Sequence, residues 1–272
     1  ESYPRVCGIE LVGEVVDSSN PAFADGQSVL VHGFGTGIAT DGGFSEYARV
    51  PAAHVMLRPD GLSDYETAVL GVPGFTTALA LDRFEQAGLT PADGPVAVTG
   101  ASGAVGMLAI SILSNAGYRV IAVTRKVEQA AMLLQLGADE ILDGAELAGA
   151  KRPLEKARFA AAIDNVGGAT LSSLLRSTQQ GGCVASVGNA GGNTFDGSVL
   201  PFIMRGISLL GIVANASWPV RHRVWGQLAT RWKPKFDGLA PHVQTIPLAG
   251  LLEHSRAQLE GSTVGRTLVS LG

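Results

Sequence analysis

Three glycines spaced three residues apart, Gly100, Gly103 and Gly106, form the pattern in this sequence that points most directly to chemistry. They follow a short apolar run, residues 95–97, and precede residues 107–117, whose apolar side chains recur at helical spacing. Between a buried strand and a helix, such glycines permit a sharp bend, a close approach of a pyrophosphate to the backbone, and close packing of the helix on the sheet. The start of the helix then offers free N–H groups and the positive end of a dipole to phosphates.

This glycine turn predicts a dinucleotide-binding unit, and its residues are the first candidates for contact with the cofactor. These candidates are Gly100, Ser102, Gly103, Ala104, Val105 and Gly106. Their spacing, G-x-x-G-x-x-G, differs from the G-x-G-x-x-G of many dinucleotide-binding proteins. The turn also stands near residue 100 instead of near the start of the sequence, and both features help to separate the families that carry such turns.

The residues that end the next expected strand, 120–123, indicate which dinucleotide binds. An enzyme that uses NAD normally carries an acidic residue at this position, where it binds the ribose hydroxyls. This sequence has Thr124, Arg125 and Lys126 instead. A hydroxyl and two cations would hold a 2′-phosphate, and Arg125 could bind it through two parallel hydrogen bonds. We therefore predict NADPH as the cofactor, with ordinary solvated charges as the alternative interpretation of Arg125 and Lys126.

Further candidates follow the later expected strands. Asn165, Val187 and Gly188 come directly after the fourth and fifth strands of the alternating region. Ligands gather at the carboxyl ends of strands in open α/β sheets, so these residues are expected to line the cofactor. Thr76 is a further candidate, because its hydroxyl could bond the cofactor, although it could equally cap a helix.

The elements that must position these residues change in type near residue 60. Up to that point, strands are expected at 9–16, 28–32, 44–50 and 54–57, with a bulge suggested at Gly13 and a glycine-rich loop at 33–43. Ser63 and Glu66 match a capping box, and helical spacing runs through Leu70 and again over 76–86. From residue 95, strands are expected at 95–97, 119–124, 140–142, 159–165, 182–187, 207–213, near 243 and at 266–269, and helices at 107–117, 127–136, 171–179, 218–231 and 248–260. Such alternation predicts an α/β fold with a doubly wound parallel sheet of the Rossmann type.

Composition excludes several classes of protein. The chain has 272 residues, of which 46% are hydrophobic, and a net charge of −4 without a long basic run, so nucleic acid is not an expected partner. No apolar run approaches the roughly 20 residues that a membrane span needs. Cys7 and Cys183 are the two cysteines, too few for a disulfide framework or a cysteine zinc cluster, although a single disulfide stays open. A reducing cytoplasm is the simplest expected location.

The positions of the tyrosines argue against the short-chain dehydrogenases, which place a similar glycine turn near the start of the chain. That family uses a Tyr-x-x-x-Lys pair well after the turn as its proton donor. The four tyrosines here are Tyr3, Tyr47, Tyr65 and Tyr118, and none follows the second strand of the alternating region.

The sequence resembles the medium-chain dehydrogenase/reductase superfamily from about residue 8 to residue 270. The motifs that carry the resemblance are the glycine turn, Leu136-Gly137-Ala138-Asp139, Asp164-Asn165-Val166-Gly167-Gly168, Gly182-Cys183-Val184 and Gly265-Arg266-Thr267-Leu268-Val269. Zinc-dependent members carry G-H-E-x-x-G early, where this chain has Ile9 in place of the histidine ligand, and a cysteine where it has Pro73. Without imidazole or thiolate ligands, no catalytic zinc is expected.

Within that superfamily the sequence is similar to the zinc-free quinone oxidoreductase branch, and most of all to its acrylyl-CoA reductase subfamily. The further strings behind this are Arg152-Pro153-Leu154-Glu155, Gly188-Asn189-Ala190-Gly191-Gly192 and Pro201-Phe202-Ile203-Met204-Arg205-Gly206. The resemblance implies a partial GroES-like catalytic domain at 1–65, an NADPH-binding Rossmann domain at 66–235, and a return segment at 236–272. The resemblance also places the nicotinamide near Val213 and a phosphate near Arg266. The alternative interpretation of Arg266 is an exposed charge at the end of a strand.

The resemblance also implies an activity and an assembly. The activity is hydride transfer from NADPH to the β-carbon of an α,β-unsaturated acyl-CoA, and the assembly is a homodimer joined at the edges of its sheets, with 207–213 as the edge strand. Two alternatives stay open: an NADPH-dependent quinone or enone reductase, and a nucleotide-binding fragment without catalysis. The family carries an Asn-Tyr-Lys-Asp segment before the strand at 8–16 that this sequence lacks, so we expect part of the N-terminal region to be missing and identify no proton donor.

Three residues are candidates for the substrate side of the site, and each has an alternative role. Glu10 stands where the subfamily usually has Asp and could orient the site, or it could pair with a neighbouring arginine. Phe34 in the glycine-rich loop is expected to edge the substrate cleft. Arg221 could bind a phosphate of CoA, with a solvated helix charge as the alternative. His32 and His54 are expected to be strand histidines with satisfied hydrogen bonds, or surface histidines.

Overall fold

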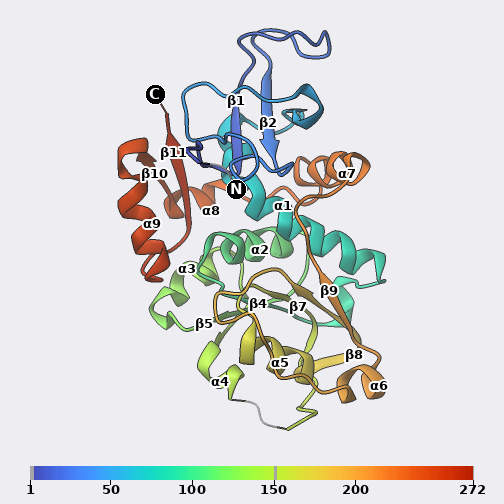
Figure 1. Cartoon of the computed structure of the whole chain (residues 1–272). Coiled ribbons are helices and arrows are strands. Elements are labelled where there is room, and N and C mark those ends of the chain that lie inside the picture. The colour runs from blue at the N-terminus through green and yellow to red at the C-terminus, as the bar shows by residue number, and fades with distance from the viewer. Residues whose placement is uncertain (1–2, 150–151, 272) are drawn as a thin grey trace. The chain divides into compact units, whose positions relative to one another are not determined.

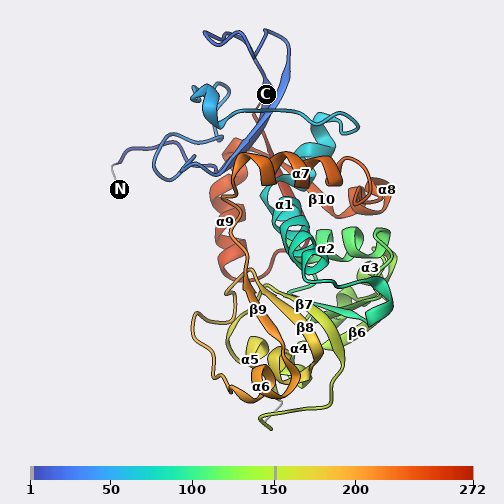
Figure 2. The ribbon, with the colours of Figure 1, turned by 90° about the vertical axis from the view of Figure 1, so that its right-hand side faces the viewer.

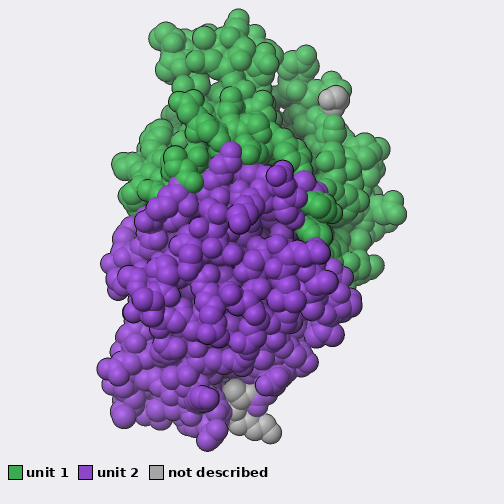
Figure 3. Space-filling view, turned by 180° about the vertical axis from the view of Figure 1, so that it is seen from behind, with its two compact units in different colours: residues 1–75, 214–230, 241–272 green, residues 76–213, 231–240 purple. Residues whose placement is uncertain are grey.

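The computed structural model describes residues 3–149 and 152–271 and is drawn in Figure 1. By packing, the chain divides into two compact units, coloured in Figure 3. Unit 1 comprises residues 1–75, 214–230 and 241–272, and unit 2 comprises residues 76–213 and 231–240. The domain ranges predicted from the sequence, 1–65, 66–235 and 236–272, stay a prediction about domain organisation.

Unit 2 is built on a parallel sheet of six strands. In chain order these are β4 (Val96–Thr99), β5 (Val120–Thr124), β6 (Glu140–Asp143), β7 (Phe159–Asp164), β8 (Thr178–Ser186) and β9 (Ser208–Gly211). Their order across the sheet is β6-β5-β4-β7-β8-β9, so the connection reverses between β4 and β7. All residues of β4, β5 and β7 are buried, as expected for strands with helices on both faces. The predicted parallel sheet is therefore confirmed.

Helices cover both faces of this sheet, with α2 and α3 on one side and α4 and α5 on the other (Figure 1 and Figure 2). The helices of unit 2 are α2 (Ala104–Asn115), α3 (Ala130–Gln135), α4 (Gly144–Ala148), α5 (Gly168–Ser177), α6 (Leu200–Arg205) and α8 (Phe236–Leu239), with 3₁₀ turns at Pro91–Asp93 and Val127–Gln129. The short helices α4, α6 and α8 were not predicted, because four to six residues give too little periodicity. Strand β8 also begins four residues earlier than expected, at Thr178.

Unit 1 contains an antiparallel sheet of β1 (Glu10–Glu14), β2 (Ser28–His32) and β3 (Met56–Leu57), and a parallel pair of β10 (Val243–Pro247) and β11 (Arg266–Ser270). Its helices are α7 (Trp218–Leu228), α9 (Leu251–Leu259) and residues 64–75 of α1 (Asp64–Gln86), with 3₁₀ turns at Ala52–His54 and Leu248–Gly250. Another 3₁₀ turn, Ala240–His242, has its first residue in unit 2 and the other two in unit 1. The bulge suggested at Gly13 is wrong, because the register from Glu10↔His32 to Glu14↔Ser28 is regular.

The strand predicted at residues 44–50 is also wrong, because this segment forms bends instead. The chain just before it pairs with residues 6–8 through backbone bonds, in which Gly43 and Phe44 donate to Gly8 and Cys7. A Cβ on Gly42 would lie 2.2 Å from the Gly8 oxygen, so the close approach depends on glycine. Within the predicted strand itself, the Ser45 hydroxyl donates to the backbone oxygen of Tyr47, a local bond between residues two positions apart.

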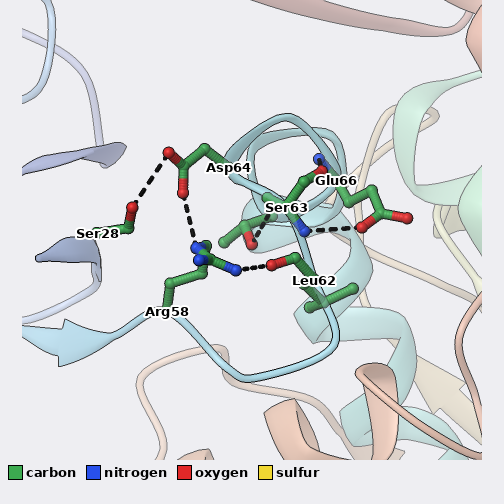
Figure 4. Close-up of polar contacts among 7 residues, drawn as sticks. Ser28, Arg58, Leu62, Ser63, Asp64 and Glu66 are labelled. Carbon is green, nitrogen blue, oxygen red and sulfur yellow. Dashed lines mark hydrogen bonds and ion pairs between the residues drawn. The ribbon is translucent and has the colours of Figure 1, made fainter.

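Helix α1 (Asp64–Gln86) begins at the predicted capping box (Figure 4). The Ser63 N–H donates to Glu66 Oε2 at 2.7 Å, and the Glu66 N–H donates to Ser63 Oγ at 3.2 Å. Next to it, the Asp64 carboxylate pairs with Arg58 at 2.8 Å and accepts a hydrogen bond from Ser28 Oγ at 3.2 Å. The reciprocal bonds of Ser63 and Glu66 satisfy backbone N–H groups that a helix start leaves without partners.

Two global properties of the described residues bear on function. None of the helices in this part of the chain combines the length and the apolar character that crossing a membrane requires. Cys7 is exposed, Cys183 is buried, and both are free thiols.

Candidate functional site

The glycine turn joins β4 to α2, as the sequence predicts. Gly100 has a φ of 59°, in the left-handed region that favours glycine, and a Cβ there would lie 3.3 Å from the Asn165 Cβ. Gly106 is needed for a different contact from the one expected. A Cβ on it would lie 2.3 Å from the Gly100 oxygen and 2.6 Å from the Ala101 Cα, so this glycine lets the helix pack on its own turn.

The start of α2 is open to an anion. Gly103 is the N-cap residue, and no side chain of the described residues caps the helix. The Gly103 N–H already donates to the Gly100 oxygen at 3.0 Å, whereas the N–H groups of the first helical residues, Ala104 and Val105, have no intrahelical acceptor. The donors for a phosphate would therefore come from Ala104 and Val105 more than from Gly103 itself. Ser102 is 8% exposed, directly before this position.

A buried network ties the end of β4 to the end of β7. The Thr99 hydroxyl donates to Asp164 Oδ1 at 2.7 Å and accepts from the Asn165 N–H at 2.9 Å. The Asn165 amide donates to the Thr99 oxygen at 2.7 Å, and Asp164 Oδ2 accepts from the Gly167 N–H at 2.9 Å. Asp164 is fully buried, and this burial raises the pKa of its carboxyl. The network fixes Asn165 beside Gly100.

The same network reaches the end of β8. The N–H groups of Val187 and Gly188 both donate to the backbone oxygen of Asp164, at 2.9 and 3.0 Å. A Cβ on Gly188 would lie 2.6 Å from the Asn165 oxygen. The structure thus brings together four of the predicted cofactor residues, Gly100, Asn165, Val187 and Gly188, at the carboxyl edge of the sheet. Sequence reasoning missed Thr99 and Asp164 as the residues that hold them there.

The three residues after β5 do not contribute equally. Thr124 is 4% exposed, and its hydroxyl accepts a hydrogen bond from the Lys126 N–H at 3.0 Å, so it shapes the turn. Lys126 is half-buried. Arg125 is exposed, and within residues 3–149 and 152–271 its side chain forms no hydrogen bond or ion pair. Among the cations predicted for the 2′-phosphate, Arg125 is the one whose charge faces solvent without a protein partner.

Two predicted residues of unit 1, Glu10 and Arg266, contact each other. Arg266 Nη2 lies 2.6 Å from Glu10 Oε1 and donates to the Ala68 oxygen at 2.9 Å. Glu10 also accepts a short hydrogen bond from the Val72 N–H. This pair spans a break in α1 at Gly71, whose φ is 44°. The arrangement matches the alternative that Glu10 pairs with an arginine, and the roles of both residues towards ligands stay predictions.

Arg221 is enclosed in unit 1, where it is 2% exposed. Its guanidinium donates to the oxygens of Ala216, His32 and the Asn215 side chain, at 2.8, 3.0 and 3.2 Å. It also lies 4.3 Å from the centroid of the Phe34 ring. In this conformation the guanidinium is bound internally, so a phosphate could reach it only after a rearrangement.

Phe34 and His32 belong to the same cluster. Phe34 has a φ of 53° and stacks on His54, with ring centroids 4.4 Å apart. The Trp225 indole donates to His32 Nε2 at 3.0 Å. Burial and the neighbouring Arg221 charge lower the pKa of His32 to about 3, so its ring is neutral. The expectation that His32 is a strand histidine with satisfied hydrogen bonds agrees with these contacts.

Thr76 and Val213, two further predicted cofactor residues, belong to unit 2. Thr76 is 7% exposed and stands five residues beyond the break in α1, so it does not occupy an N-cap position. Val213 follows β9 and is 72% exposed. Among the residues that the structure describes, no group of three or more His, Cys, Asp or Glu side chains is arranged to hold a metal ion.

Comparison with known proteins places this architecture in a family. The model of the family described as zinc-binding dehydrogenase matches residues 104–230. The chain is 44% identical to "Putative quinone oxidoreductase YhfP" of Bacillus subtilis, over 85% of this chain and 71% of that protein. It is 39% identical to the acrylyl-CoA reductase AcuI of Ruegeria pomeroyi, over 99% of this chain and 82% of that protein.

Solved structures agree with the sequence comparison. Escherichia coli YhdH with bound NADPH superimposes with a TM-score of 0.95 at 36% identity, covering 100% of this chain and 84% of that one. YhfP with bound NAD superimposes with the same TM-score at 41% identity, covering 99% of this chain and 82% of that one. The chain therefore belongs to the zinc-binding dehydrogenase family, within the medium-chain dehydrogenase/reductase superfamily of oxidoreductases.

Proposed function

We propose that this protein is a zinc-independent, NADPH-dependent reductase that reduces the C=C bond of an α,β-unsaturated acyl-CoA such as acrylyl-CoA. The observation that carries the substrate class is the 39% identity to an acrylyl-CoA reductase over 99% of this chain. The β-rich part of unit 1 then corresponds to a GroES-like catalytic domain, and the two free thiols suit a reducing compartment such as the cytoplasm.

The residues of unit 2 fit a dinucleotide. A side chain at Gly106 would clash with the turn, and the uncapped start of α2 leaves the N–H groups of Ala104 and Val105 for the pyrophosphate. The amide of Asn165 and the backbone of Val187 and Gly188 would line the same edge of the sheet. Thr99 and Asp164 act only through Asn165, Val187 and Gly188, which their hydrogen bonds hold in place.

Arg125 supports NADPH over NADH. Its guanidinium has no partner among the described residues, and no acidic side chain ends β5, where an NAD enzyme carries one. A 2′-phosphate would receive charge-assisted hydrogen bonds there, which are about twice as strong as neutral ones. The NADPH in the YhdH structure supports this assignment, whereas the NAD in the YhfP structure makes NADH the competing cofactor that a test must include.

When bound, NADPH supplies a hydride to the β-carbon of the substrate, and the α-carbon takes up a proton. Conjugation with the thioester carbonyl already makes the β-carbon electrophilic, so the reaction does not require a metal. The protein would contribute by holding the two carbons about 3–3.5 Å apart and by stabilising the negative charge that develops on the thioester oxygen.

A second candidate is reduction of quinones or enones by NADPH, favoured by the 44% identity to YhfP. Turnover of NADPH with acrylyl-CoA, crotonyl-CoA and a 1,4-quinone, measured side by side, distinguishes the two. The proposal predicts the highest kcat/KM with a thioester. Quinone turnover without thioester turnover would replace it with the second candidate, and NADPH binding without any turnover would indicate a nucleotide-binding protein without catalysis.

We also propose a homodimer joined at β9, which is an edge strand of the six-stranded sheet. Unpaired backbone groups at such an edge favour association with another strand. Helix α6, which precedes β9 in the chain, carries exposed apolar side chains: Ile203 is 70% and Met204 65% exposed. Val199, directly before α6, is also 70% exposed. Sedimentation velocity should give a dimer for the wild type and a monomer for Ile203→Glu. Leu259→Glu on α9, where Leu259 is 90% exposed, serves as the control.

A further inference from the structure

The side chain of Arg125 lies against a residue that has no side chain of its own, Gly144. Gly144 is the first residue of α4, and the turn at Arg125 follows β5, the neighbour of β6 in the sheet. A Cβ on Gly144 would lie 3.3 Å from the Arg125 Cγ, a contact tighter than nine in ten that real Cβ atoms make. The aliphatic stem of the arginine therefore occupies part of the space that a side chain at position 144 would need.

A side chain at position 144 would also contact the backbone of the turn. Its Cβ would lie in van der Waals contact with the Thr124 carbonyl carbon, at 3.6 Å, and with the Arg125 nitrogen, at 3.7 Å. These are backbone atoms of the turn, held in place because Thr124 pairs with Asp143 across the strands. The stem of Arg125 is the movable neighbour, so a Cβ at position 144 would displace it by a few tenths of an ångström, and a larger side chain would displace it further.

The nearby acidic residue does not neutralise this arginine. Asp143 precedes Gly144, but its Oδ1 accepts the N–H of Ala145 at 2.8 Å and so caps α4. No ion pair joins Asp143 to Arg125 in the described part of the chain. The arginine therefore keeps its charge for a ligand, while its stem is positioned by contact with Gly144.

We propose that Gly144 is a specificity-determining residue for the 2′-phosphate of NADPH, because its missing side chain lets the Arg125 stem lie where the guanidinium meets that phosphate. This inference rests on the proposed use of NADPH. Gly144 touches no phosphate itself and acts only through Arg125. The backbone at Gly144 lies outside the left-handed region, so substitutions there introduce bulk without backbone strain.

Binding measured by isothermal titration calorimetry, with NADPH and NADH in parallel, tests the proposal without reference to turnover. Arg125→Ala should weaken NADPH binding roughly tenfold, the loss expected for a charge-assisted hydrogen bond. Gly144→Val should weaken NADPH binding by several-fold, Gly144→Ala by less, and neither should change NADH binding. Gly238→Val is the matched control, because Gly238 lies in another short helix of unit 2 with no atom within 4 Å of its Cβ position.

The double variant Arg125→Ala/Gly144→Val tests whether the effect of Gly144 on NADPH binding depends on Arg125. If Gly144 acts through Arg125, this variant binds NADPH no more weakly than Arg125→Ala alone. Full additivity, unchanged NADPH binding by Gly144→Val, or equal losses for NADPH and NADH would each overturn the role of Gly144. If Arg125→Ala instead weakens both cofactors equally, or the wild type prefers NADH, the proposed cofactor itself is wrong.

Discussion

The carboxylate of Glu10 and the guanidinium of Arg266 form an ion pair, with Oε1 and Nη2 2.6 Å apart, at the break in helix α1. Glu10 receives the N–H of Val72 after the break, and Arg266 donates to the oxygen of Ala68 before it. A Cβ on Gly71 would lie 2.3 Å from Glu10 Oε2, so the glycine makes room for the carboxylate. The pair thus supplies partners to both helix ends that the break exposes.

Removing this carboxylate should destabilise the protein. Glu10→Ala leaves Arg266, whose side chain is 13% exposed, without its counter-charge and the Val72 N–H without an acceptor. We expect a loss of about 2–3 kcal/mol in the free energy of unfolding, and a smaller loss for Glu10→Gln, which keeps an acceptor. Urea denaturation measures it, with Glu14→Ala on the exposed end of the same strand as the control. Equal stability of Glu10→Ala and Glu14→Ala would contradict this role.

The neutral state of His32 predicts how stability depends on pH. Its pKa is about 3 in the folded protein, against about 6.5 in an unfolded chain. Between these values the unfolded state binds a proton that the folded state does not. The free energy of unfolding should therefore fall as the pH drops below about 6.5, by at most about 1.4 kcal/mol per pH unit from this group.

Variants isolate that contribution from those of other groups. His32→Gln should lose the His32 part of the slope, so the difference between its stability and that of the wild type changes with pH between about 6.5 and 3. His222→Gln, at an exposed position, is the matched control for the substitution itself. A stability difference between His32→Gln and the wild type that stays constant over this range would show that His32 is not held neutral by the fold.

Loss of the Thr99 hydroxyl should lower the free energy of unfolding far more than loss of the Thr77 hydroxyl. Thr99 and Thr77 are both 0% exposed, but Thr99 Oγ1 joins Asp164 to Asn165, whereas Thr77 Oγ1 has no hydrogen-bond partner. Thr99→Val should cost about 1–3 kcal/mol in unfolding free energy and weaken NADPH binding, because it removes a hydrogen bond to the buried Asp164 carboxylate and leaves the Asn165 N–H without its acceptor. Thr77→Val should be neutral or stabilising. Comparable losses for the two variants would argue against a special role of this network.

Local signals in the sequence predicted much of this structure. The φ of Gly100 and the reciprocal bonds of Ser63 and Glu66 depend on a few neighbouring residues, so spacing alone reveals them. The buried strands were predicted for the same reason, because β5 and β7 are continuous apolar runs. The error at residues 44–50 arose where a glycine loop pairs with a segment some 35 residues earlier, a contact that no local pattern records.

The candidate site was predictable only in part. Glycines and strand ends identified Gly100, Asn165, Val187 and Gly188, because these positions follow from the order of elements. Burial of Arg221 by residues almost 190 positions away in sequence could not be foreseen. The contact between Arg125 and Gly144 likewise depends on the pairing of β5 with β6, which becomes visible only in three dimensions.

Transfer of a deuterium label tests whether this protein delivers a hydride from NADPH to the β-carbon of an enoyl thioester. NADPH carrying deuterium at the transferred position of nicotinamide C4 is mixed with acrylyl-CoA and this protein, and the product is examined by NMR. We expect propionyl-CoA with the deuterium at the β-carbon, and no such product in a reaction without the protein. Absence of this product, or deuterium found at the α-carbon, would contradict it.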